Sequence, residues 1–189
     1  MESRFANVVI PFIMTDKKID NFLGAPFGSS ISSVKEFFNR SYDTVFDEKL
    51  SDNDCLFFNG VKYEGRATTL VLLHFVNDKF AKGSAFMKAA NENEILPMFR
   101  QLVNEINAKY YITDQDYANY TAPFEKDDGY SITAIAKDKL TVSAYWNFVS
   151  ANKEDDYITA RINNDMEIIV SYEDGYLMNL LVEGRKNSK

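Results

Sequence analysis

Two stretches of the chain carry apolar residues at helical spacing. The pair Ser29-Ser30 precedes the first stretch and can cap the free N–H groups of a first turn. Ser33 and Glu36 fit a capping box one turn later, so the sequence leaves the exact start open. The apolar residues of this first stretch form one stripe at helical spacing, which predicts an amphipathic helix that ends near Arg40. Its apolar members are Ile31, Val34, Phe37 and Phe38.

The second stretch predicts a longer amphipathic helix. Asn93 stands where an N-cap is expected, and Pro97 falls in the first turn, where its missing N–H costs little. Polar residues occupy the opposite face, so one side of this helix should be buried. The apolar stripe consists of Ile95, Met98, Phe99, Leu102, Val103, Ile106 and Tyr110.

Strand candidates make up most of the remaining chain. Short apolar or alternating runs are separated by residues that favour turns, and short separators imply antiparallel neighbours. Residues 41–54 and 112–129 are polar and are predicted as connections. Strands are predicted at 7–14, 56–58, 61–63, 68–76, 80–87, 131–136, 140–149, 157–162, 167–172 and 176–183.

Two features of these strands carry additional information. The pair Asn59-Gly60 favours a tight turn, because both residues tolerate positive φ, and Glu64-Gly65 is a competing turn. Residues 68–76 are apolar at both alternating sets of positions. We therefore predict a central strand that is covered on one face by a helix and contacted on the other face by a second layer.

This order of elements predicts an α+β fold: a curved antiparallel sheet with two helices packed on one face. A helix followed by a meander of strands occurs twice, so we expect a single domain over 1–189 with halves at about 20–90 and 91–184. A parallel doubly wound fold is excluded, because it requires strands and helices to alternate.

The first half of the chain resembles a known group of proteins. The likeness covers roughly residues 20–111, and more weakly the strands to 183. It lies in Phe22 to Gly28 (FLGAPFG), Ser30 to Phe38, Leu56 to Gly60 (LFFNG), Leu70 to Phe75, Asn77 to Phe80, and Asn107 to Tyr110. The pattern is similar to that of small uncharacterised bacterial proteins of the Bacteroidetes type, which resemble the β-lactamase inhibitor protein and small outer-membrane-assembly lipoproteins in architecture. The resemblance implies protein binding rather than a catalytic set.

The charge of the chain limits the classes of partner. The net charge is −7 with a sequence pI of about 4.8. Nucleic-acid binding requires a basic stripe, and the densest basic pairs, Lys17-Lys18 and Arg185-Lys186, are isolated. We therefore expect no nucleic-acid partner. An acidic surface fits either a basic protein partner or simple solubility.

Cysteine content and hydropathy bear on the compartment. Cys55 is the single cysteine, so no intrachain disulfide can form. The apolar stretch 5–14 is too short to span a bilayer, which takes about 20 residues, and it lacks the basic start of a signal peptide. We expect no membrane span and a cytoplasmic protein, or a periplasmic or envelope protein if an upstream signal was removed.

Candidates for chemistry are few, and we predict no catalytic residue, metal or cofactor. His74 is the only histidine and falls in an apolar strand, where a structural role is favoured. A nucleophilic pair of Cys55 and His74 is conceivable if their strands are adjacent, although nothing nearby lowers the pKa of Cys55. Asp114 and Asp116 resemble the start of a calcium loop, but its later glycine and glutamate are missing.

The binding candidates are aromatic and acidic residues in the second half of the chain. Tyrosines offer a large contact area at low entropic cost. The candidate residues are Tyr111, Tyr117, Tyr120, Trp146, Asp127 and Asp128. A core position for Trp146 and a turn at Asp127-Asp128-Gly129 are the alternatives.

Two functional hypotheses follow. The first is a non-catalytic module that binds a protein or peptide, for example as an inhibitor, through an exposed aromatic patch ringed by acidic residues on the open face of the sheet. The alternative is a small-molecule-binding protein or enzyme, with a closed apolar cavity between the sheet and the second helix that His74 or Cys55 lines.

Overall fold

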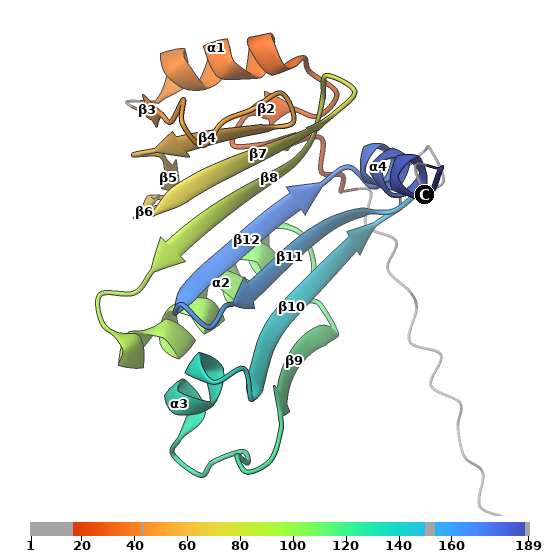
Figure 1. Ribbon diagram of the computed structural model, residues 1–189. Helices are drawn as coiled ribbons and strands as arrows, with labels where there is room; N and C mark the ends of the chain where they lie inside the picture. Colours follow the sequence, from red (N-terminus) through yellow and green to blue (C-terminus); the bar gives the residue numbers. More distant parts are fainter. Residues whose placement is uncertain (1–16, 43, 150–153, 188–189) are drawn as a thin grey trace, which may run out of the picture.

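The chain folds around one large antiparallel sheet, with helices beside it (Figure 1). The computed structural model describes residues 17–42, 44–149 and 154–187, so the predicted strand at 7–14 lies outside the described residues. The predicted α+β fold with an antiparallel sheet is confirmed. The sheet is neither closed into a barrel nor strongly curled.

Eight strands form this sheet in the order β3-β4-β7-β8-β12-β11-β10-β9. They are β3 (Val45–Phe46), β4 (Cys55–Asn59), β7 (Leu70–Val76), β8 (Lys79–Lys88), β9 (Gln115–Tyr120), β10 (Leu140–Phe148), β11 (Asp156–Ile162) and β12 (Glu167–Glu173). Helix α1 (Ile31–Ser41) precedes the first four strands, and α2 (Ile95–Lys109) precedes the last four. The two groups meet where β8 pairs with β12.

Helices α1 and α2 pack on the same face of the sheet, which carries the core. Phe38 of α1 stacks on Phe58 of β4, with ring centroids 5.0 Å apart. Trp146 of β10 donates its indole N–H to the side-chain oxygen of Asn107 in α2, at 2.9 Å. Alternate residues of each strand point into this layer, because successive side chains lie on opposite faces of a sheet. One core cluster therefore extends under both helices.

Helices α1 and α2 begin in different ways. Ser30 caps α1 as predicted, and its hydroxyl accepts a hydrogen bond from the amide of Ser33 at 3.3 Å. The predicted N-cap of α2 is wrong: Asn93 lies inside a 3₁₀ turn, η1 (Glu92–Glu94), and no side chain caps the helix that follows.

Two short hairpins lie beside the main sheet. The hairpin of β1 (Asn21–Phe22) and β2 (Ala25–Pro26) places the Phe22 ring directly over Gly83, where a Cβ atom would lie 2.1 Å from the ring. The hairpin of β5 (Lys62–Tyr63) and β6 (Arg66–Ala67) turns at Glu64-Gly65, with φ values of 46° and 81°. Of the two turns that the sequence offered, the hairpin therefore forms at Glu64-Gly65 and not at Asn59-Gly60.

The prediction of only two helices is wrong, because two predicted strands are helical. Residues 131–136 form α3 (Ser131–Ala136), which packs on β10. Residues 176–183 lie in α4 (Gly175–Asn187), which packs against β7, β8 and β11 at the end of the sheet (Figure 1). The Asp174 carboxylate accepts a hydrogen bond from the Leu177 amide at 2.8 Å and caps α4. None of the described helices is long and apolar enough to cross a membrane.

The predicted polar connection at 112–129 contains a strand. β9 pairs with β10 along its whole length and forms one edge of the sheet. Most of its side chains are exposed, so it lacks the apolar alternation that identifies a half-buried strand. The short strand β3, at the other edge, was likewise hidden in the polar stretch 41–54.

Candidate functional site

The sheet face opposite α1 and α2 carries apolar side chains that do not belong to the core cluster. We call this group the open-face patch; it consists of Phe57, Leu70, Leu72, Phe86 and Ile169. The strand register makes its members neighbours: Phe57 pairs with Leu72, Leu70 with Phe86, and Phe86 with Ile169. Ile169 is buried by its neighbours, and the other four are half-buried.

The polar side chains nearest to the patch form hydrogen bonds or ion pairs with one another. The hydroxyls of Ser84 and Ser171 lie 2.7 Å apart and are buried between larger neighbours. Lys82 and Glu173, on the same two strands, form an ion pair at 2.8 Å. A partner that covers this area therefore meets no buried polar group that would be left without a hydrogen bond.

Aromatic residues and an arginine occupy the other end of the same face. Tyr117 of β9 and Tyr145 of β10 are 42% and 37% exposed, with ring centroids 6.1 Å apart. Arg161 of β11 pairs in register with Ile169 on one side and with the buried Ser143 on the other. Tyrosine and arginine are the residue types enriched at the energetic centres of protein interfaces.

The pair Cys55 and His74 also lies on this face, where β4 meets β7. The register places them opposite each other, and the Cys55 Sγ lies 3.1 Å from the His74 Nδ1. Burial raises the pKa of the Cys55 thiol, and the negative charges of Asp52 and Asp54 raise it further. The thiol therefore stays protonated at neutral pH, whereas nucleophilic catalysis requires the thiolate.

The structure separates the predicted binding residues. Only Tyr117 lies on the open face with its ring exposed, while the half-buried Tyr120 bonds the Ser131 hydroxyl of α3 at 2.9 Å. Tyr111 is fixed by the backbone of Asn147, whose amide donates to its hydroxyl at 2.8 Å and whose carbonyl accepts at 3.0 Å.

The other predicted binding residues lie in the core or in a turn. Trp146 is fully buried in the core, which is the alternative that the sequence left open. The Asp128 carboxylate accepts hydrogen bonds from the amides of Glu125 and Tyr130, so this residue shapes a turn. Asp127 is exposed in the same turn.

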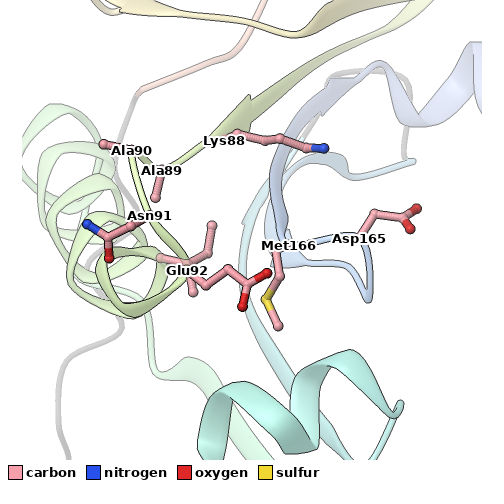
Figure 2. A pocket seen from close by; sticks show the side chains of 8 residues that line it. Lys88, Ala89, Ala90, Asn91, Glu92, Asp165 and Met166 are labelled. Atoms are coloured by element: carbon pink, nitrogen blue, oxygen red, sulfur yellow. The ribbon is translucent and has the colours of Figure 1, made fainter.

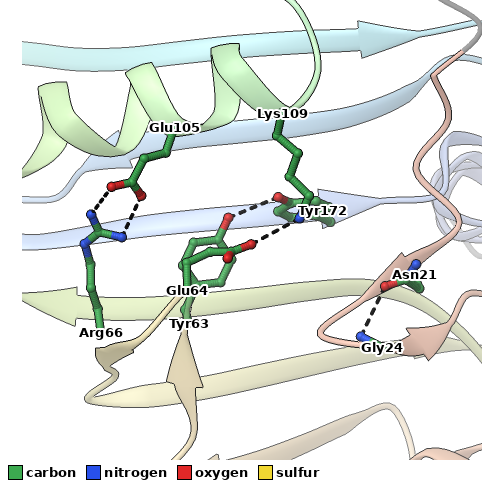
Figure 3. A network of polar contacts seen from close by, with 8 residues as sticks. All are labelled: Asn21, Gly24, Tyr63, Glu64, Arg66, Glu105, Lys109 and Tyr172. Carbon is green, nitrogen blue, oxygen red and sulfur yellow. Dashed lines mark hydrogen bonds and ion pairs between the residues drawn. The ribbon is translucent and has the colours of Figure 1, made fainter.

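A hollow of about 560 Å³ lies between the β5–β6 hairpin, α2 and β12. Figure 3 shows two ion pairs that join the hairpin to α2: Arg66 with Glu105, through two bonds of 2.6 and 2.7 Å, and Glu64 with Lys109 at 3.1 Å. Beneath them, the hydroxyls of Tyr63 and Tyr172 lie 3.0 Å apart. Burial raises the pKa of both tyrosines, so both are neutral at physiological pH.

A second hollow, of about 200 Å³, lies where η1 approaches the β11–β12 turn (Figure 2). Its rim carries Lys88, Glu92 and Asp165, and Met166 points toward it. Among the described residues, no group of histidine, cysteine and carboxylate side chains could hold a metal ion. Neither hollow is lined by His74 or Cys55, one of which the alternative hypothesis places in a cavity between the sheet and the second helix.

Comparisons with protein-family models, curated proteins and solved structures find no match to the chain. Sequence reasoning did not single out the open-face patch, Tyr145 or Arg161. The signal that could have identified the patch is the second set of apolar positions in 68–76, which indicated a layer on the far face of that strand.

Proposed function

We propose that this protein is a non-catalytic binding module that docks a protein or peptide partner on the open face of its sheet. The observation that carries the proposal is the open-face patch, an apolar group that lies outside the core cluster, on the face opposite α1 and α2. Apolar surface left in water forgoes about 25 cal/mol per Å², and contiguous apolar patches mark interaction sites. Inhibition of the partner is one form that such binding could take.

The position of the patch relates it to the two halves of the chain. Phe86 lies in β8 and Ile169 in β12, the two strands at which the four-strand groups join. We propose that the halves 20–90 and 91–184 act as one binding surface, so that a partner contacts both. The acidic composition supports a protein partner over a nucleic acid.

A matched pair of variants tests this function. Phe86→Lys places a charge in the open-face patch, whereas Leu50→Lys changes an exposed apolar residue outside the patch, in the turn that precedes β4. Each variant and the wild type are purified from the native host by affinity, and co-purified proteins are quantified by mass spectrometry. We expect at least one protein whose recovery falls more than tenfold with Phe86→Lys only, because burial of a phenylalanine contributes about 1.5–3 kcal/mol.

Circular dichroism of both variants checks that the fold is retained. If all three preparations recover the same proteins in equal amounts, the open face does not bind a partner under these conditions of growth and the proposal is wrong.

A second candidate function is small-molecule binding in the hollow beside the β5–β6 hairpin. The buried hydroxyl pair of Tyr63 and Tyr172 favours it, because convergent polar groups in an apolar setting orient ligands. Tyr63→Phe should then abolish the thermal stabilisation that an active metabolite fraction gives the wild type. A ligand that stabilises both proteins equally would exclude this site.

A further inference from the structure

We propose that the partner presents an amphipathic helix to the open face, and that an acidic residue of this helix pairs with Arg161. This inference rests on the proposed function and names the class of partner. Four observations support it: the state of the backbone on this face, the size of the patch, the charge of Arg161, and the aromatic residues beside it.

The backbone groups of the strands under the patch are already paired, which favours a helical partner segment over an extended one. The patch lies on interior strands, where both neighbours in the sheet already pair with the N–H and C=O groups of each strand. An extended segment laid on this face would bury its own backbone groups without partners, which costs free energy for each group. A helix satisfies its backbone internally and can bury an apolar stripe, as α1 and α2 do on the other face.

The dimensions of the patch fit one helix rather than a second copy of the chain. From β4 to β11 the patch and Arg161 cross four strand spacings, or roughly 19 Å at about 4.8 Å each. Along the strands the patch extends only from Leu70 to Leu72 and their pairs. A helix with its side chains is about 10 Å wide, whereas a stable globular interface buries about 800 Å² on each partner.

Arg161 defines the charge that the partner should carry. The structure describes the side chains of four arginines, and three of them form ion pairs: Arg40 with Glu36, Arg66 with Glu105, and Arg100 with Asp116. Arg161 is exposed and has no hydrogen bond or ion pair with any described residue. A guanidinium binds a carboxylate through two parallel hydrogen bonds, so an Asp or Glu of the partner fits this position.

The neighbours of Arg161 extend the same surface. Ile169 joins it to the open-face patch, and Tyr145 lies two residue pairs further along β10, on the same face. The Tyr117 and Tyr145 rings can cover the aliphatic part of an acidic side chain that reaches Arg161. The partner helix should therefore carry its apolar stripe toward Phe86 and Leu70 and its acidic residue toward the tyrosines.

Photo-crosslinking tests this inference on the full chain in its native host. The crosslinking amino acid p-benzoylphenylalanine replaces Phe57 at the rim of the patch, and in a control it replaces Leu50. Crosslinked peptides are sequenced by mass spectrometry. We expect one partner segment with apolar residues at positions i, i+3 or i+4, and i+7, together with an Asp or Glu, captured from the Phe57 position only.

A charge swap then tests Arg161 itself. The captured segment is synthesised, and its binding to the full chain is measured by fluorescence anisotropy. Arg161→Glu should weaken binding about tenfold or more, Arg161→Lys should weaken it less, and a peptide with lysine in place of the acidic residue should restore binding to Arg161→Glu. A general loss of structure would not be rescued by the altered peptide.

The outcomes separate the two proposals. A captured segment with alternating strand-like pattern, or one whose binding is unchanged by Arg161→Glu, overturns this inference and leaves the proposed function intact. Capture of residues 1–16 of the same chain, or of a second copy, also overturns it. If the Phe57 position captures no other protein, both the inference and the proposed function are wrong.

Discussion

At the scale of single residues, Asp156 makes stability depend on pH. This half-buried carboxylate begins β11 and accepts a hydrogen bond from the Gly175 amide at 2.9 Å. Burial, and then the negative charges of Asp174 and Asp155, raise its pKa from 3.8 to about 6. Because the folded state holds the proton more tightly, the stability from this group is complete below about pH 4 and is lost as the pH rises through 6.

We therefore predict that Asp156→Asn changes the pH profile of unfolding. The amide keeps an acceptor for Gly175 but cannot ionise. Between pH 4 and pH 7 the wild type should lose on the order of 1 kcal/mol relative to the variant, after allowance for solvent screening. Urea unfolding at several pH values measures this difference. Asp127→Asn removes a charge at an exposed turn and serves as the control; parallel profiles for wild type and Asp156→Asn would contradict the prediction.

Residue types alone located few of the candidate site residues. Tyr117, a binding candidate from the sequence, is exposed. Only the registers of β11 with β10 and with β12 show that Arg161 lies between Ser143 and Ile169. The contact of Cys55 with His74 depends in the same way on β4 pairing with β7. Such contacts join residues from different strands, so no local pattern contains them.

At the scale of elements, the β7–β8 turn holds α1 in place. The Asp78 carboxylate, in this turn, accepts a hydrogen bond from the Ile31 amide at 3.0 Å. A carboxylate at a helix N-terminus satisfies a free N–H group and interacts favourably with the helix dipole. The start of α1 is thus capped twice, by its own Ser30 and by a residue 47 positions away along the chain.

We predict that Asp78→Ala lowers the free energy of unfolding by about 1–2 kcal/mol. Asp78→Asn should cost less, because asparagine retains an acceptor oxygen and tolerates the positive φ of 60° at this position. Urea unfolding of the three proteins measures both effects. Equal losses for the two variants would show that the hydrogen bond contributes nothing.

Elements whose apolar pattern repeats over several turns were predictable from the sequence, and short or exposed elements were not. The stripes of α1 and α2 span three and four turns, and both helices were found. α3 has only six residues, too few for helical and strand periods to differ clearly, and Ile132 and Ile135 fit a helix turn. Asp174 caps α4, but an Asp-Gly pair is also typical of a turn between strands, and residues 176–183 after it were predicted as a strand.

At the scale of the whole molecule, one core cluster joins both halves of the chain. We predict a single cooperative unfolding transition, in which the fluorescence of Trp146 and far-UV circular dichroism coincide. Phe38→Ala in α1 should lower the free energy of unfolding by about 3–5 kcal/mol. Both transitions should shift equally, although Trp146 belongs to the second half of the chain. If the mutation shifts the circular dichroism transition and leaves the fluorescence transition unchanged, the halves unfold separately.

The pairing of β8 with β12 also affects folding during synthesis, because one edge of β8 stays unpaired until β12 has been made. During synthesis on the ribosome, each residue of β8 emerges 79 to 91 residues before its partner in β12, since the register joins Lys88 to Glu167 and Lys82 to Glu173. Until then the ten-residue β8 is an unprotected strand edge on the nascent chain, and such edges recruit other chains. Slow translation of the second half should therefore favour aggregation, and a chaperone that binds nascent chains should suppress it.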